Sequence, residues 1–193
     1  MARTRQFDQK KVIHDATKLF CQKGYEATSI SDIVKATKLN RHSMYEIFKN
    51  KEGLFIECLY YFAYEVLSGL SDILNDETRD IESIKKYFTT LIDYVYGPDF
   101  HGCLYCATIT HKGNIAPEIS NVIDRYFAQQ NQMFLNCLVN AKEKSQIPAK
   151  KNTEDLATFL QTSVIGIVIG VKTNIDRKTT EKVYENIVHT LTD

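Results

Sequence analysis

Apolar residues recur along the chain with the spacing of amphipathic α-helices. One apolar stripe predicts a helix over about residues 8–23, and Gly24 follows it as the glycine that commonly ends a helix. The stripe consists of Val12, Ile13, Ala16, Leu19 and Phe20. The sequence has only 8 glycines and 3 prolines among 193 residues, which is few for the many turns of an all-β protein. The pattern therefore predicts an all-α fold.

Two short helices are predicted next, each with a polar residue at its start. Ser29 and Asp32 have the three-residue spacing of a capping box at the beginning of a second helix. After a three-residue turn, Asn40 is placed to cap a third helix. The inward positions of that helix are Met44 and Phe48, which lie four residues apart on one face.

Longer helices are predicted for the rest of the chain, which gives about nine helices and no convincing strand. Their approximate bounds are 51–74, 80–96, 102–111, 117–144, 152–173 and 178–191. The longest uninterrupted apolar run, Val164 to Val171, has eight residues, whereas a membrane span needs about 20. The first residues contain no apolar segment of a signal peptide. We therefore expect a cytoplasmic protein without a membrane span.

The formal net charge of zero conceals a difference between the two ends of the chain. Residues 1–51 contain eleven Lys and Arg against five Asp and Glu, whereas residues 52–193 contain thirteen against nineteen. A basic segment attached to an acidic body suggests a nucleic-acid contact confined to one end. Chance clustering of charges on solvated faces explains the same numbers, so the charge alone does not decide between the two.

The three N-terminal helices have the arrangement of a helix-turn-helix, in which two short helices joined by a tight turn pack on a third. One helix of such a motif fits the major groove, and cations around it neutralise phosphates. The third predicted helix has a polar face opposite its apolar one, formed by Asn40, Arg41, His42, Ser43 and Glu46. Any helix hairpin has an outer polar face, so a purely structural role stays open at this point.

A longer string narrows the interpretation. Residues 16–55 read ATKLFCQKGYEATSISDIVKATKLNRHSMYEIFKNKEGLF. This string resembles the DNA-binding domain of the tetracycline-repressor (TetR) family of bacterial transcriptional regulators. The matching features are the LF…GY..TS…I opening, the pair Met44-Tyr45, Phe48, and the KNKEGL entry into the fourth helix. The resemblance is close over about residues 10–56 and weaker over the remaining helices.

The resemblance implies a helix-turn-helix domain over residues 1–51 and a helical effector-binding and dimerisation domain over residues 52–193. It also implies which side chains meet DNA. The third helix would read bases with Arg41, His42 and Ser43, while Tyr45 and Lys51 would touch phosphates. The expected DNA-binding residues are Thr28, Ser29, Asn40, Arg41, His42, Ser43, Tyr45 and Lys51. Thr28 and Ser29 would offer hydroxyl and N–H groups to a phosphate at the start of the second helix.

Two residues depart from the family's pattern. Lys38 stands in the turn where the family usually has glycine, and a non-glycine residue in a left-handed conformation costs about 1 kcal/mol. We therefore expect a slightly reshaped turn. His42 replaces a residue that is frequently small, which puts a bulky and titratable side chain near the groove. The operator sequence therefore does not follow from the relatives.

The body is expected to form a homodimer. LATFLQTSVIGIVIGVKT is apolar on most of its circumference, so this helix must be buried on several sides, in the core or against a partner. In the family, the last two long helices of two subunits form a four-helix interface. The residues expected in the interface are Phe159, Ile167, Gly170, Val183 and Ile187. Such a dimer would place two recognition helices about 34 Å apart on a palindromic DNA operator.

The resemblance implies a small-molecule effector bound among the helices of the body. The aromatic residues Tyr64, Tyr105, Phe127 and Phe134 are candidates to line that pocket. An aromatic residue at helical spacing belongs to the core more often than to a ligand site, so the sequence does not identify the effector. We expect a regulator that an effector releases from DNA by favouring a conformation with wrongly spaced recognition helices. Repression and activation both stay open.

The string HGCLYCATITH at residues 101–111 contains a Cys-x-x-Cys pair between two histidines. A helix would place His111 about 12 Å along its axis from Cys103, which is too far for one metal ion. Thioredoxin-like chemistry would need a βαβ setting, which this chain lacks. The alternatives that remain are buried apolar thiols and a redox or electrophile sensor at Cys103. We expect no metal and no cofactor.

Two other functions were weighed against an operator-binding regulator. The chain contains no His-Glu-x-x-His, Gly-x-Ser-x-Gly or phosphate-loop motif, so we do not expect an enzyme. The helix-turn-helix could instead serve a protein partner. The predicted exposure of Arg41, His42 and Lys51 favours double-stranded DNA.

Overall fold

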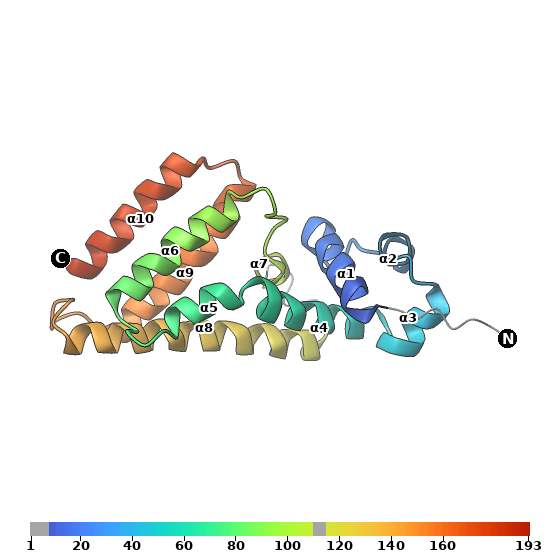
Figure 1. The fold of residues 1–193 in the computed structure, drawn as a ribbon, viewed down its shortest axis with the longest axis horizontal. Coiled ribbons are helices and arrows are strands. Elements are labelled where there is room, and N and C mark those ends of the chain that lie inside the picture. Colours follow the sequence, from blue (N-terminus) through green and yellow to red (C-terminus); the bar gives the residue numbers. More distant parts are fainter. Residues whose placement is uncertain (1–7, 110–114) are drawn as a thin grey trace. The chain divides into compact units, whose positions relative to one another are not determined.

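The computed structural model describes residues 8–109 and 115–193, and within these ranges it is entirely helical (Figure 1). The predicted all-α fold is therefore confirmed. The helices are α1 (Gln9–Lys23), α2 (Ile30–Thr37), α3 (Arg41–Phe48), α4 (Lys51–Tyr61), α5 (Ser68–Leu74), α6 (Ile81–Val95), α7 (Leu104–Ile109), α8 (Pro117–Glu143), α9 (Thr153–Lys172) and α10 (Arg177–Thr192). A π-helical segment, η1 (Phe62–Val66), lies between α4 and α5.

The chain folds into two compact units that do not divide at residue 51. The first unit comprises the chain up to Val66 together with Cys103–Val122, and the second comprises Leu67–Gly102 and Ile123–Asp193. Helices α1–α4, η1 and α7 therefore belong together. The predicted boundary between residues 51 and 52 falls inside the first unit, because α4 packs directly on α1.

The apolar stripe of α1 builds the core of the first unit. Helix α1 packs on α2 and on α4, and Ala16 and Phe20 are completely buried there. The rings of Phe20 and Phe55 meet edge to face with centroids 4.8 Å apart, a favourable arrangement for an aromatic pair. Of the predicted stripe only Leu19 is merely half-buried. The hydrophobic periodicity thus identified the packing face of this helix.

Helix ends in the first unit follow the predicted capping chemistry. Ser29 Oγ accepts a hydrogen bond from the Asp32 amide at 3.1 Å, and Asp32 Oδ2 accepts one from the Ser29 amide at 2.9 Å. Asn40 Oδ1 accepts from the Ser43 amide at 2.8 Å. Each cap satisfies amide groups that have no partner within their helix, so the capping box and the cap of the third helix are confirmed.

The fourth predicted helix is interrupted, which raises the number of α-helices in the described ranges from the expected nine to ten. The prediction of one helix over residues 51–74 was wrong, because η1 follows α4 and Leu67 then precedes a separate α5. Phe62 and Leu67 are both buried although they lie five positions apart. A π turn accommodates such a five-residue step, whereas a regular α-helix would not.

The second unit is built around α6. Helix α6 packs on α5, α9 and α10, and α9 also packs on α10. Two polar ties hold this arrangement. The Tyr96 hydroxyl donates to the Ile175 carbonyl and lies 2.7 Å from Thr180 Oγ1. The buried carboxylate of Asp80 pairs with Lys144 Nζ at 2.8 Å and also accepts from Gln146 Nε2.

Helix α9 is, among the described residues, the one helix long and apolar enough to cross a membrane by length and composition. This was not predicted from the sequence, because the longest uninterrupted apolar run, Val164 to Val171, has only eight residues. A core helix of a soluble protein passes the same test. The apolar window is 39% buried, so a large part of its surface is exposed on the chain.

Helices α3 and α4 approach so closely that only glycine fits at the contact. A Cβ atom on Gly53 would lie 2.2 Å from the carbonyl oxygen of Phe48, which is part of the backbone and cannot move away cheaply. The turn between the two helices is equally constrained. Lys49 has φ 67° and ψ −52°, and the Asn50 amide donates to the Phe48 carbonyl at 2.8 Å, which is the rarer and strained form of γ-turn.

Gly53→Ala should lower the free energy of unfolding by about 1–3 kcal/mol, because the added methyl group overpacks this contact. Gly69→Ala is the matched control, since a Cβ atom there meets nothing within 4 Å. The control should be neutral or stabilising by up to about 1 kcal/mol. Urea unfolding followed by circular dichroism measures both variants. Equal stability of the two would contradict the close approach.

Candidate nucleic-acid interface

The turn between α2 and α3 places α3 on the surface of the first unit. Lys38 ends α2 in the left-handed conformation, with φ 56° and ψ 16°. This non-glycine residue thus adopts the left-handed conformation itself, at a cost of about 1 kcal/mol, and the slightly reshaped turn stays a prediction. Leu39 follows and is 7% exposed, so the turn itself contributes to the core. A buried side chain in the turn keeps α3 at a fixed position on α2.

Helix α3 has one face in the core and one face in solvent. Met44 and Phe48 are 0% and 5% exposed, as predicted for the inward positions. Arg41 and His42 in the first turn are exposed, Ser43 is half-buried, and Tyr45 is 43% exposed. The first turn and the following tyrosine therefore form a continuous polar surface, which we call the α3 face (Arg41, His42, Ser43 and Tyr45).

The side chains of three of the other predicted residues form hydrogen bonds within the unit. Thr28 is 1% exposed and its hydroxyl donates to the Gly24 carbonyl at 2.6 Å, so its predicted phosphate contact is wrong. Ser29 is exposed, but its hydroxyl donates to Asp32 Oδ2 at 2.7 Å. Asn40 is also exposed and uses its side-chain oxygen as the cap of α3.

A carboxylate at the start of α2 is neutralised within the unit. Asp32 accepts hydrogen bonds from Ser29 and pairs with Lys23 Nζ at 2.8 Å. Lys23 and Ser29 together hold the pKa of this carboxyl well below its usual range. The ion pair offsets the negative charge that this carboxylate would otherwise bring close to a phosphate at the same helix end.

Lys51 begins α4 and is held in position by an aromatic ring. Its Nζ lies 4.3 Å from the ring centroid of Tyr25, a cation–π distance. Burial lowers the pKa of this half-buried lysine, and the neighbouring Glu26 opposes that effect. The ammonium group is thus fixed before any ligand arrives.

Two exposed lysines at the ends of α3 were not among the predicted DNA-binding residues. Lys38 lies in the turn before α3, and Lys49 lies in the strained turn after it. Both have positive φ angles, which place these side chains on the bends of the backbone rather than along a helix face. A lysine at a turn position beside a candidate recognition helix is the sequence signal that could have identified them.

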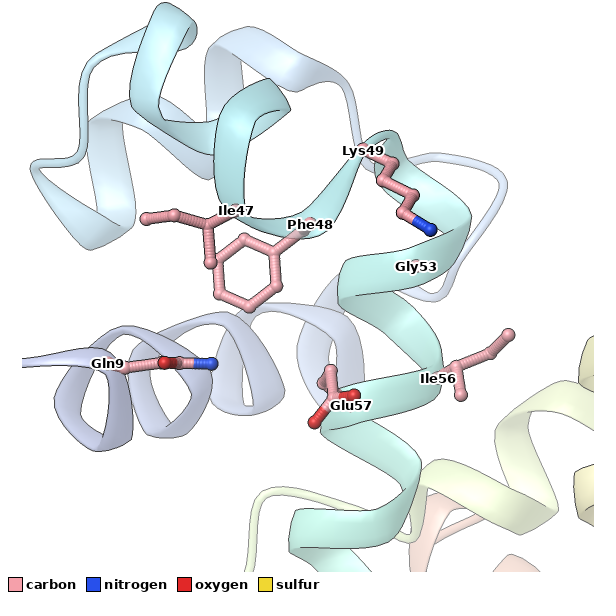
Figure 2. A pocket seen from close by; sticks show the side chains of 7 residues that line it. All are labelled: Gln9, Ile47, Phe48, Lys49, Gly53, Ile56 and Glu57. Carbon is pink, nitrogen blue, oxygen red and sulfur yellow. The ribbon is translucent and has the colours of Figure 1, made fainter.

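A surface depression of about 250 Å³ lies beside the α3–α4 turn. Figure 2 shows its lining residues, which come from α1, α3, the turn after α3, and α4. They are Gln9, Ile47, Phe48, Lys49, Gly53, Ile56 and Glu57. Ile47 is 37% exposed, so the depression is open to solvent and is not an enclosed cavity for a small molecule.

Residues 12–58 match the family model described as bacterial regulatory proteins, tetR family. The chain is 29% identical over 172 residues to the HTH-type transcriptional repressor ComR from Escherichia coli (strain K12), covering 88% of this chain and 82% of ComR. It is 25% identical over 178 residues to the repressor DhaR from Mycobacterium sp. (strain GP1), covering 88% and 85%. The chain belongs to the tetR family of bacterial regulatory proteins.

Solved structures share the fold of this tetR-family protein. The regulator CifR, as a cysteine mutant complexed with 26-base-pair operator DNA, has a TM-score of 0.85 at 23% identity, covering 97% of this chain and 98% of that one. The reduced form of NemR from E. coli has a TM-score of 0.80 at 16% identity, covering 92% and 93%. This protein is a helix-turn-helix transcriptional regulator that binds DNA. Its relatives act as regulators, which is a non-enzymatic role.

The four aromatic residues predicted to line an effector pocket are divided between the two units of this tetR-family protein. Tyr64 is 74% exposed in the first unit and therefore lines no enclosed cavity there. Tyr105 is buried in the same unit and its hydroxyl donates to the Leu59 carbonyl at 3.0 Å. Phe127 is half-buried and Phe134 completely buried in the second unit.

The residues predicted for the dimer interface of this tetR-family protein occupy two different environments. Ile167 and Ile187 are 5% and 2% exposed, and Gly170 is also buried. The assignment of these three to a surface interface was wrong, because α9 and α10 use them to pack within their own chain. Phe159 and Val183, in contrast, are 36% and 41% exposed.

The thiols of this tetR-family protein differ in burial. Cys21, Cys58, Cys106 and Cys137 are buried, whereas Cys103 is only half-buried. Burial raises the pKa of both Cys58 and Cys137 to about 12, which keeps these two thiols protonated. Within residues 8–109 and 115–193 no three His, Cys, Asp or Glu side chains are grouped so as to hold a metal ion. His111 lies outside the described residues.

Proposed function

We propose that this protein represses transcription by binding a palindromic operator as a homodimer, and that a small-molecule effector releases it. The observation that carries the proposal is the α3 face, which is exposed on a helix fixed at its first turn, its last turn and the close contact with α4. The repressor ComR supports the direction of regulation. We place the protein in the cytoplasm with the DNA and assign it no cofactor.

The residues divide into base-reading and phosphate-binding groups. Arg41, His42 and Ser43 lie in the first turn of α3, the part of a recognition helix that reaches base edges. Tyr45 and Lys51 would contact phosphates on either side, and the exposed Lys38 and Lys49 add to the positive field. Ser29 and Asn40 contribute through the helix starts that they cap. The amides of the first turn of α2 would meet a phosphate there.

Arg41→Ala and Lys51→Ala should have different effects on DNA binding. If Arg41 reads a base, its loss weakens the selected operator by about 1–3 kcal/mol and relaxes preference at one position. If Lys51 binds a phosphate, its loss weakens all duplexes alike and reduces the salt slope by about 0.9. The operator is first selected from a random duplex pool, and binding is then followed by fluorescence anisotropy at several salt concentrations.

Lys86→Ala, an exposed lysine of α6 in the second unit, controls for the loss of one positive charge. A Lys51→Ala effect confined to one base pair would contradict the phosphate role. An unchanged Arg41→Ala affinity would remove Arg41 from base reading. If no duplex were enriched from the pool, a protein partner would replace DNA as the target of this helix-turn-helix.

The dimer would form through the exposed side of α9 and α10. We define the α9 face as Phe159, Thr162, Gly166 and Ile169, which are all exposed. Their spacing of three and four residues puts them on one side of the helix. Val183 extends this surface onto α10 with 41% exposure. Exposed apolar residues in a continuous stripe are characteristic of a helix that packs on a partner.

Gly166 gives the α9 face a low point at its centre. A Cβ atom there would meet nothing within 4 Å, so the glycine is not required by the chain's own packing. Small residues permit two helices to approach closely. The corrected interface retains the predicted Phe159 and Val183 and replaces the three buried residues by Thr162, Gly166 and Ile169.

Gly166→Glu should convert the dimer into a monomer without unfolding it, because the new side chain enters open space in the chain but blocks a partner helix. Sedimentation velocity measures the oligomeric state, and circular dichroism checks the fold. Gly69→Glu is the matched control, since that position is equally open. A Gly166→Glu variant that remained dimeric would place the interface elsewhere.

Effector release requires two conformations that differ in the spacing of the two recognition helices. An effector that binds one conformation more tightly shifts the population toward it and lowers the affinity for DNA. The helical body of the second unit is the part of the chain that the family resemblance assigns to the effector. Phe127 and Phe134 belong to this body and are retained as its candidate residues.

A second candidate mechanism for the same fold is release by thiol chemistry. Cys103 is the least buried of the five thiols, and it directly precedes α7 in the first unit. Solved structures of this fold include cysteine mutants of CifR and the reduced form of NemR. We infer that Cys103 would react in preference to the buried thiols Cys58 and Cys137.

If Cys103 is the sensor, a thiol-specific electrophile such as N-ethylmaleimide should release wild-type protein from the selected operator and leave Cys103→Ser bound. Fluorescence anisotropy of labelled operator measures the release. Cys21→Ser, a change at a buried thiol, should respond like the wild type. Equal release of Cys103→Ser and the wild type would assign the effect to another residue.

A further inference from the structure

One polar atom in the core of the second unit has no partner. Gln130 lies in the middle of α8 and is 4% exposed. Its Nε2 donates to the hydroxyl of Tyr87 on α6 at 3.0 Å. Its Oε1 is, within the described part of the chain, the one buried side-chain nitrogen or oxygen without a hydrogen-bond partner.

An unpaired buried amide oxygen is unfavourable in a folded protein. It has lost its bonds to water and gained none in exchange, so the great majority of buried polar atoms in native proteins are paired. Another buried polar group of this unit shows the contrast. Asp80 accepts hydrogen bonds from Lys144, Gln146 and the Glu82 amide. The Oε1 atom of Gln130 therefore lacks a hydrogen-bond donor, whereas the other buried side-chain nitrogen and oxygen atoms of the described residues have partners.

The Tyr87 side chain that binds the amide belongs to a cluster of buried aromatic rings. The ring of Tyr87 lies edge to face with Phe134, with centroids 5.0 Å apart, and with Phe88 at 5.6 Å. Phe134 is one helical turn beyond Gln130 on α8 and stacks on Phe88 at 6.1 Å. Aromatic walls with one fixed polar group are characteristic of sites that bind small apolar molecules.

The surroundings also determine the charge that a ligand can carry. Asp80 is the one buried residue with a formal charge among the described residues, and Lys144 neutralises it. A charged ligand at Gln130 would find no counter-ion and would have to lose its hydration without compensation. A neutral molecule with a hydrogen-bond donor has no such cost.

We propose that Gln130 anchors the effector, which is a small neutral aromatic molecule with a hydroxyl or N–H donor. The donor bonds Oε1 of Gln130, while the ring lies among Tyr87, Phe88 and Phe134. This proposal rests on the proposed function, because it assigns the ligand of the effector-binding body. It replaces the four aromatic residues expected from the sequence with one polar anchor and three rings, of which Phe134 is common to both sets.

A partly exposed region lies close to the anchor. Phe127 precedes Gln130 by three residues on α8 and is half-buried. The side chain of Gln161 on α9, also half-buried, donates to the Phe127 carbonyl. The amide of Gln130 is thus about one helical turn from side chains that solvent reaches.

The test titrates phenol, which has one ring and one donor, into the full-length protein by isothermal calorimetry. Gln130→Leu should weaken phenol binding by about threefold to tenfold, the effect of one hydrogen bond. Gln129→Leu is the matched control, because Gln129 is exposed on the same helix and makes the same side-chain change. Anisole, which has the same ring but no donor, should bind the wild type about as weakly as phenol binds Gln130→Leu.

Thermal unfolding without ligand provides a second measurement. Gln130→Leu should raise the melting temperature, since it removes an unpaired polar group from the core. Gln130→Met, unbranched like glutamine, takes its place if leucine disturbs the helix. The combination of higher stability with weaker phenol binding is expected only if the amide serves a ligand.

Three results would overturn the proposal. If phenol bound neither the wild type nor Gln129→Leu, the partner of the Gln130 amide oxygen would be a buried water and not a ligand. Equal affinity of phenol for Gln130→Leu and the wild type would place the ligand elsewhere, and equal affinity of anisole and phenol would exclude the donor. Operator binding is measured without phenol, so a failure of the DNA-binding function is seen separately from a failure of this site.

Discussion

The backbone contact between α3 and α4 is the constraint on which the DNA-binding unit depends. Gly53 brings α4 against the Phe48 carbonyl, closer than any side chain would allow. Lys49 accepts a strained conformation so that the two helices can be joined without a longer loop. Because α4 packs along α1, this contact fixes α3 to the core of the unit. The position of α3 is therefore fixed by this backbone contact and does not depend on contacts made by its exposed side chains.

The two units differ in where their polar and apolar side chains lie. In the first unit, polar and charged side chains lie at helix ends, where Ser29 and Asn40 cap helices and Lys23 pairs with Asp32. The α3 face remains exposed. In the second, α9 has apolar residues on both its inner and its outer sides. Its inner side closes the core, and its outer side offers the surface that a second copy would cover.

Local chemistry made much of the fold predictable. The stripe of α1, the capping box at Ser29 and the caps at Asn40 and Gly24 depend on residues only a few positions apart, and the structure confirms them. The left-handed Lys38 was predictable for the same reason. The interruption after α4 was not predicted, because Phe62 and Leu67 are two of many apolar residues in this stretch and the sequence alone does not show that both are buried. A five-residue step is visible only when the burial of both residues is known.

By itself, the sequence determined the helical fold, the position of the helix-turn-helix and the residues that could face DNA. Tertiary structure decided which of those residues are exposed. Thr28 is not, because its hydroxyl turns inward to the Gly24 carbonyl. Tertiary structure also decided which side of α9 is free, since periodicity shows two apolar sides but not which one the chain buries. The unpaired oxygen of Gln130 is likewise a feature that only the tertiary structure shows. A hydrogen bond that is missing can be recognised only after every neighbour in space is known.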